Sequence, residues 1–254
     1  MNSIVVLYRK EWTELCRTKR LYALLGVYIL FGMVSPILAR YMKEIVSASM
    51  GSAAPILITT PVWSDSWKHF YSNLSQMGGI SVLLIFMSCI CGEKQAKTAE
   101  LLFTKNLSPT ELLTTKYLSA VVSVILAFFP AVLLCWGYTY YLFGYSGEWK
   151  NIMEGAFFYV IFMVVLLSIV VLASTLATTV AFAAMFAFGG YLVLILSTYL
   201  PVVGSLMPGS LLTMTMSAII NGCPNVILPQ IVIALVVSIL CICTSIYILK
   251  HQEI

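Results

Sequence analysis

The sequence predicts an all-α, polytopic membrane protein with six transmembrane helices, and three observations lead to this prediction. The chain has 254 residues, of which 61% are hydrophobic and only 9% are charged, whereas soluble domains carry roughly 25% charged residues. Its apolar residues lie in long uncharged runs, and residues 155–249 contain no Asp, Glu, Lys or Arg. A spanning helix needs about 20 apolar residues, so a chain of this length has room for about six of them with their connections.

The first span is delimited by two arginines. Residues 21–39 form an uncharged run between Arg20 and Arg40, long enough to cross a bilayer as a helix. No small-residue cleavage site follows a short apolar core, so we expect this segment to be retained rather than removed as a signal peptide.

The other spans follow from the remaining uncharged runs and the breaks within them. Pro130 lies in the middle of the third run and predicts a kink there. Hydroxyl-rich and Pro-Gly positions divide 155–249 into three spans. Within one transmembrane domain, 1–254, the predicted spans are 21–39, 74–91, 118–143, 152–173, 180–200 and 227–249.

The distribution of Lys and Arg predicts the orientation. With the N-terminus in the cytoplasm, ten of the 14 basic residues lie on the cytoplasmic side and four on the other side, as the positive-inside rule requires. We therefore expect a multi-pass protein of the cell (plasma) membrane with both termini cytoplasmic. Residues 201–226 then form an outer connection.

An amphipathic interfacial helix is predicted within residues 1–20. At 100° per residue its apolar face comprises Ile4, Leu7, Tyr8, Trp12 and Leu15. The opposite face carries Arg9 and Arg17, so we expect this face to point toward lipid head groups and water. Glu11 falls within the apolar arc. It either lies at the edge of the arc and reaches water, or pairs with a basic residue of the next cytoplasmic loop.

Residues 92–116 form a second cytoplasmic segment, with two helix signals in a row. Residues 96–103 are good helix formers bounded by charged residues. Ser108-Pro109-Thr110-Glu111 is a capping box with proline at the first helical position, so a new helix begins there and continues into the third span. A short helix, a turn and a second helix predict an ordered docking element.

In this segment the sequence resembles a known family, the permeases of type-2 ABC transporters (ABC exporters). The similarity lies in the loop after their second span, and the basic segment before span one is similar to the helix that precedes their first span. The matching residues are Gly92-Glu93, Thr98-Ala99-Glu100-Leu101-Leu102, Thr104-Lys105, Ser108-Pro109-Thr110-Glu111-Leu112-Leu113 and Lys116. Lys97 occupies the place of a usual glycine, a departure that concerns the local helix geometry.

The resemblance implies a half-size membrane subunit whose coupling helix, between spans two and three, inserts into a groove on a cytoplasmic ABC ATPase. Two ATPase copies and a second permease subunit, identical or related, complete such a transporter. ATP brings the ATPases together, which pushes the 93–104 helix and rocks the permease pair from inward- to outward-facing. The residues expected to couple to the ATPase are Glu93, Lys94, Thr98, Glu100, Leu101, Lys105 and Glu111, and those of the interfacial helix are Arg9, Glu11 and Trp12. For Glu93, Glu100, Lys105 and Glu111 the alternative interpretation is a solvated surface charge.

The sequence supports this division of labour independently. It contains no G-x-x-x-x-G-K-[ST] phosphate loop, so ATP and Mg are expected on the partner subunit. We expect no catalytic residue, metal ligand or bound cofactor in this chain, because its only histidines, His69 and His251, lie outside the predicted spans. The predicted spans also lack a central ionisable residue, which disfavours ion-coupled transport. The basic residues are too few and scattered for nucleic-acid binding.

Two other functions stay open on the sequence alone. A membrane channel is compatible with Pro130 and the hydroxyl-rich fourth and fifth spans, although no selectivity-filter repeat or charged ring is present. A non-pumping immunity or scaffold protein differs from a permease in lacking an ATPase partner. The sequence does not choose among lipid, peptide, drug and ion as the substrate.

Overall fold

The computed structural model describes residues 3–50, 60–95, 108–201, 204–222 and 228–251. Within these ranges every regular element is a helix and no strand occurs, which confirms the all-α class. Six helical stretches are long and apolar enough to cross a membrane, as predicted. They are Arg20–Val46, Trp63–Gln95, Pro109–Phe143, Trp149–Leu176, Val180–Tyr199 and Leu228–His251.

The helices follow one another with short breaks. The α-helices are α1 (Ser3–Arg17), α2 (Arg20–Met50), α3 (Trp63–Asn73), α4 (Gly79–Phe86), α5 (Cys91–Gln95), α7 (Pro109–Phe143), α8 (Trp149–Leu176), α9 (Val180–Leu196), α10 (Leu211–Asn221) and α11 (Leu228–His251). A π-helical turn, η2 (Leu74–Gly78), joins α3 to α4, and three 3-10 turns, η3 (Ser197–Tyr199), η4 (Gly204–Leu206) and η5 (Pro208–Ser210), lie between α9 and α10.

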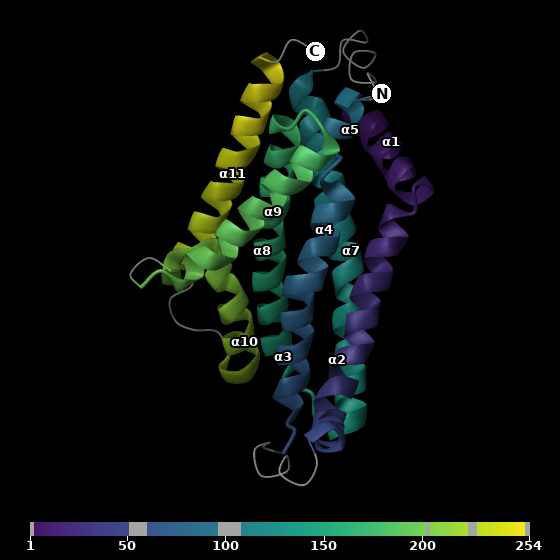
Figure 1. Ribbon diagram of the computed structural model, residues 1–254, viewed down its shortest axis with the longest axis vertical. Coiled ribbons are helices and arrows are strands. Elements are labelled where there is room, and N and C mark those ends of the chain that lie inside the picture. The colour runs from purple at the N-terminus through teal and green to yellow at the C-terminus, as the bar shows by residue number, and fades with distance from the viewer. Residues whose placement is uncertain (1–2, 51–59, 96–107, 202–203, 223–227, 252–254) are drawn as a thin grey trace.

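Helix α8 forms the centre of the bundle. Helices α2 and α7 pack side by side on one flank, while α9 and α11 pack against α8 on the other (Figure 1). In its apolar window 72% of α8 is buried inside the chain, against 17% of α11. The start of α1, helix α5 and the end of α11 lie at one end of the bundle, which we call the inner end (Figure 1). The opposite end, where α3 begins, is the outer end.

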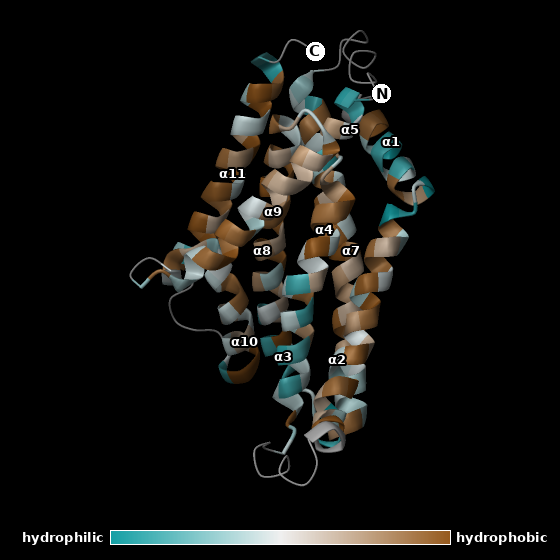
Figure 2. Ribbon diagram, viewed as in Figure 1, coloured by the Kyte–Doolittle hydropathy of each residue, from teal (hydrophilic) through white to brown (hydrophobic). Residues whose placement is uncertain are grey.

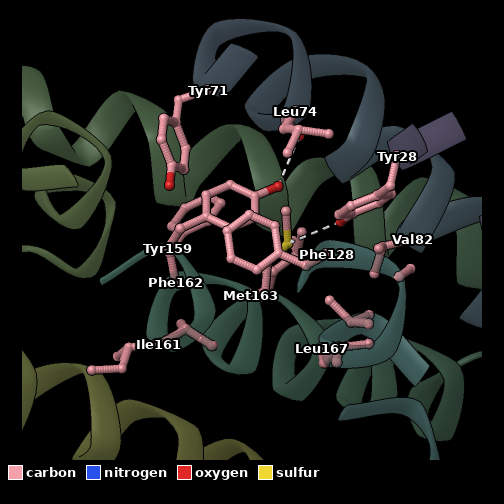
Figure 3. Packing of buried hydrophobic residues seen from close by; sticks show 14 of the residues in the cluster. Tyr28, Tyr71, Leu74, Val82, Phe128, Tyr159, Ile161, Phe162, Met163 and Leu167 are labelled. Atoms are coloured by element: carbon pink, nitrogen blue, oxygen red, sulfur yellow. Dashed lines mark hydrogen bonds between the residues drawn. The ribbon is translucent and has the colours of Figure 1, made fainter. Parts of the chain in front are cut away.

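An aromatic core joins three helices in the middle of the bundle. The Phe128 and Tyr159 rings, from α7 and α8, stack with centroids 4.7 Å apart, and Tyr71 of α3 meets Tyr159 at 5.5 Å (Figure 3). Such pairs add about 0.5–1.5 kcal/mol beyond the apolar area that they bury. On the same flank the backbones of α2 and α7 approach closely, because a Cβ at Gly32 would lie 2.7 Å from the Ala131 carbonyl oxygen.

The second membrane stretch begins at Trp63, earlier than the predicted span 74–91. Trp67 and Phe70 of α3 are fully buried, while Lys68 between them is exposed. Polar residues such as Lys68 and His69 lower the hydropathy of this segment, so the uncharged-run criterion placed the start of the span too late. The stretch is also broken, first at η2 and again at residues 87–90.

Neighbouring helices supply hydrogen bonds at the first break. At η2 the Tyr159 hydroxyl donates to the Leu74 carbonyl at 3.1 Å (Figure 3), and the Tyr191 hydroxyl donates to the Ser75 carbonyl. Irregular backbone at membrane depth is tolerated only where protein groups satisfy it. Tyrosines of α8 and α9 therefore stabilise the π-helical turn.

The segment 201–226, predicted as an outer connection, contains the packed helix α10. Its Leu211, Ala218 and Ile219 side chains are buried. A Cβ at Gly155 of α8 would lie 2.7 Å from Ile219 Cγ1, so this glycine permits the close approach of α10. An 11-residue helix is too short to span a membrane, which is why hydropathy does not indicate it.

Candidate functional site

Helix α1 packs on α7 through a stripe that includes a carboxylate. Leu7, Glu11 and Leu15, spaced four residues apart, are 5%, 6% and 6% exposed. A carboxylate in such a stripe costs free energy unless it is paired and hydrogen-bonded. Glu11 therefore requires a cationic partner on the neighbouring helices.

That partner is Lys116 of α7. Lys116 Nζ lies 3.0 Å from Glu11 Oε2 and 3.0 Å from Glu93 Oε1, and only 4% of the Lys116 side chain is exposed. Lys10 Nζ completes the group, 3.2 Å from Glu93 Oε1 and 3.6 Å from Glu11 Oε1. We call Glu11, Glu93, Lys116 and Lys10 the ion-pair cluster. Its two carboxylates and two ammonium groups balance in formal charge.

The cluster decides between the two interpretations of Glu11. This residue pairs with a basic residue of the segment 92–116, which confirms the second interpretation, and it does not reach water at the edge of the arc. Glu93 is likewise only 14% exposed at its side chain. Its alternative interpretation as a solvated surface charge is therefore wrong.

The predicted capping box positions Lys116. Glu111 N donates to Ser108 Oγ at 3.2 Å, and Ser108 N donates to Glu111 Oε2 at 3.4 Å, with Pro109 at the first helical position. This confirms the start of α7. Lys116 then lies on the buried face of α7, together with Leu112 and Ser119.

A second set of contacts attaches α5 to the end of α8. At the break 87–90, the backbone N–H groups of Ile90 and Cys91 both donate to Ser174 Oγ, each at 3.0 Å. Lys94 Nζ donates to the Thr175 carbonyl at 2.6 Å, near the C-terminus of α8. A cation is favourable there because the last carbonyls of a helix carry partial negative charge.

The first span is tied to the same region. Arg20, the first residue of α2, donates to Ser88 Oγ at 3.1 Å within the second break. Trp12 is half-buried and stacks on Tyr8 with centroids 6.4 Å apart. Arg9 is exposed. Of the residues predicted for the interfacial helix, Glu11 alone enters the ion-pair cluster.

The predicted coupling residues fall into two groups. Glu93 and Lys94 lie in α5, and Glu111 caps α7. The remaining four, Thr98, Glu100, Leu101 and Lys105, lie outside the residues that the structure describes. The predicted helix 96–103 also lies outside them.

The sequence argument gave Lys10 and Ser174 no role in the site, and it named Lys116 only among the residues that match the family loop. Lys116 carried a signal, since it is the last charged residue before the uncharged run 117–147. Ser174 belongs to the hydroxyl-rich positions that were used to divide residues 155–249 into spans. Its bonds to two amide groups 84 and 83 residues away are a tertiary feature.

The cluster is electrostatic in character. The carboxylates of Glu11, Glu14 and Glu93 lie within 4.8 Å of one another, a spacing that a metal ion could bridge. Lys116 Nζ already contacts two of them at 3.0 Å. An ammonium group therefore supplies the positive charge at this position, and the arrangement serves to hold α1, α5 and α7 together.

The described residues form a bundle with six helical stretches long and apolar enough to cross a membrane, and with buried ion pairs at one end. A family model described as "ABC-2 family transporter protein" matches residues 5–249, and the chain belongs to this family. The chain is also 21% identical over 191 residues to the uncharacterized transmembrane protein YxlG of Bacillus subtilis (strain 168), an alignment that covers 74% of each chain. It is therefore a multi-pass membrane protein and a component of transport that is not itself catalytic.

Proposed function

We propose that this chain is the permease subunit of an ATP-driven exporter. ATP and Mg bind to a separate ABC ATPase, of which two copies serve two permease subunits, identical or related. The inner end faces the cytoplasm, so both termini are cytoplasmic in the cell membrane. The observation that carries the proposal is that Glu93 and Lys116, on either side of the segment 96–107, meet in one buried ion-pair cluster.

The contacts at the inner end provide two routes for a push on that segment. One route runs through α5 into α8, by way of Ser174 and Thr175. The other runs through Glu93 and Lys116 into α1 and α7. Ion pairs in a low-dielectric interior hold their geometry, and breaking one by removing a partner is costly. A displacement of the segment therefore moves these helices together, as alternating access requires.

The predicted coupling residues then divide into two roles. Thr98, Glu100, Leu101 and Lys105 form the surface that docks on the ATPase. Glu93 and Lys94 fix α5 to its neighbours, and Glu111 fixes the start of α7.

Gentle extraction of the tagged protein from its native membrane, followed by mass spectrometry, tests the proposal. We expect a soluble protein with a phosphate loop at near-equal stoichiometry. The double variant Glu100→Ala/Leu101→Ala should insert normally but lose this partner. The matched control Glu44→Ala/Ile45→Ala changes an acid and an aliphatic residue near the other end of α2 and should retain it. Recovery of the chain alone, even after cross-linking, would instead favour a channel or a scaffold.

Cysteine labelling in intact cells tests the orientation separately. A cysteine introduced by Lys105→Cys should react only with reagents that reach the cytoplasm. A cysteine introduced by Asp65→Cys, at the start of α3, should react with impermeant reagents from outside. The reverse pattern would overturn the orientation but leave the ATPase partner to be decided by co-purification.

A further inference from the structure

A shallow basic groove runs along the exposed side of α1, beside the ion-pair cluster. It is an open depression of about 590 Å³, lined by Val6, Arg9, Lys10, Thr13, Glu14, Arg17 and Thr18. Three cationic side chains thus face one carboxylate. The hydrophilic face of α1 is visible along this helix in Figure 2.

We propose that this groove binds the phosphate of an anionic phospholipid head group. Arg9 and Arg17 lie eight residues apart, about two turns, and both are exposed, so they can approach one anion from two sides. Guanidinium groups bind phosphate with paired hydrogen bonds. Lys10 adds a third cation on the same wall.

The position of the groove favours a lipid over a soluble anion. Helix α1 leads directly into α2, and Tyr22, Gly26 and Leu30 of α2 form an outward-facing strip at intervals of four residues. Tyr22 and Leu30 are 61% and 52% exposed, and a Cβ at Gly26 would meet nothing within 4 Å. A charged groove followed by an apolar strip matches an amphiphile with a phosphate head and acyl chains.

Lys10 connects this groove to the ion-pair cluster. Its Nζ lies 3.2 Å from Glu93 Oε1 while its side chain also lines the groove and is 42% exposed. A bound phosphate therefore competes with Glu93 for Lys10. Because such coupling is reciprocal, any change that loosens the Lys10–Glu93 pair should strengthen lipid binding.

Native mass spectrometry of the purified full-length chain, titrated with phosphatidylglycerol or phosphatidylcholine, tests the proposal. We expect preferential retention of phosphatidylglycerol. Arg9→Gln/Arg17→Gln removes both guanidinium groups from the groove and should weaken this binding about tenfold. The control Arg40→Gln/Lys150→Gln removes two exposed positive charges that lie toward the outer end, away from the groove. It should leave the binding unchanged.

Three outcomes would contradict the proposal. Equal loss of binding in both double variants would indicate a general charge effect rather than a site. Displacement of the lipid by millimolar inorganic phosphate or glycerol phosphate would indicate a soluble anion as the ligand. Unchanged lipid binding, combined with loss of the co-purifying ATPase in the Arg9/Arg17 variant, would make the groove a protein contact.

The variant Glu93→Gln tests the link through Lys10. It removes the charge that competes for Lys10, so it should raise the affinity for phosphatidylglycerol about twofold to fivefold. Unchanged or weaker affinity would show that Lys10 does not connect the groove to the cluster.

Discussion

The middle of the bundle and its inner end solve the same structural problem with different chemistry. Both contain a break in the stretch Trp63–Gln95. In the middle, the hydroxyls of Tyr159 and Tyr191 donate to carbonyls at η2. At the inner end, Ser174 accepts two amide protons, and charged residues surround the break. Neutral hydrogen bonds are sufficient in the middle of the bundle, whereas charged residues lie at its inner end, in α1, α5 and α7.

This difference has an energetic consequence. Interhelical hydrogen bonds in membranes contribute roughly 0.6 kcal/mol on average, so those at η2 can rearrange at low cost. Removing one partner of a buried ion pair costs about 3–5 kcal/mol. We therefore expect the middle of the bundle to adjust during transport while α1, α5 and α7 stay together at the inner end.

The largest effect is expected from Lys116→Met. The substitution leaves the Glu11 and Glu93 carboxylates buried without Lys116 between them, so stability should fall by about 3–5 kcal/mol. Thermal unfolding of the purified protein in detergent measures the loss. The control Lys250→Met, an exposed lysine at the same end, should change the melting temperature little.

A charge exchange separates electrostatics from packing. In Glu11→Lys/Lys116→Glu the new lysine still has two carboxylates within reach, because the Glu11 and Glu93 oxygens lie within 4.8 Å of each other. The double variant should recover a substantial part of the stability lost in Lys116→Met. If it is no more stable than Lys116→Met, the cluster acts through side-chain packing alone.

A smaller effect is expected from Ser174→Ala. The Ile90 and Cys91 amide groups lose their acceptor, which should cost about 1–3 kcal/mol and speed hydrogen exchange at these two amides. Ser245→Ala is the matched control: Ser245 is also buried, but its hydroxyl donates to the Cys241 carbonyl within the same helix. Equal exchange at residues 90 and 91 in both variants would contradict the assigned role of Ser174.

Tyr159→Phe should have a milder effect, about 0.5–1.5 kcal/mol. It removes the hydrogen bond to the Leu74 carbonyl but keeps the aromatic ring in the core (Figure 3). Tyr71→Phe is its control, since Tyr71 is also a buried core tyrosine but its hydroxyl has no hydrogen-bond partner among the described residues. If thermal unfolding shows the two variants equally destabilised, the η2 bond contributes nothing specific.

The smallest effect is expected from Lys68→Ala at the outer end. Lys68 pairs with Asp65 at 2.9 Å, but its side chain is 56% exposed, and exposed pairs contribute about 0–1 kcal/mol. The change in thermal stability should be far below that of Lys116→Met. A comparable loss would remove the distinction between exposed and buried charges on which the comparison depends.

The sequence predicted the local features of the site better than its tertiary ones. The capping box at Ser108 was predictable because all its atoms lie within four residues. The unusual place of Glu11 in an apolar arc was also visible. Its partner is 105 residues away, so two interpretations remained until the packing of α1 on α7 was known.

The fold shows the same division. Six apolar stretches and their helical class follow from uncharged runs, since the bilayer admits few other solutions. The π-helical turn at η2 depends instead on hydrogen bonds from the tyrosines of α8 and α9. Helix α10 depends on the close approach that the missing side chain of Gly155 permits.

The central claim is that the ion-pair cluster makes α1 and α7 move as one body. Spin labels at Thr13 and Thr114, both exposed, allow the distance between these helices to be measured by electron resonance in the complex with its ATPase. With native cysteines replaced, the account predicts the same narrow distribution without nucleotide and in an ATP-trapped state, and a broadened one in Glu11→Gln/Lys116→Gln. If the distance between the two labels shifts with nucleotide in the labelled protein that retains Glu11 and Lys116, the claim is contradicted.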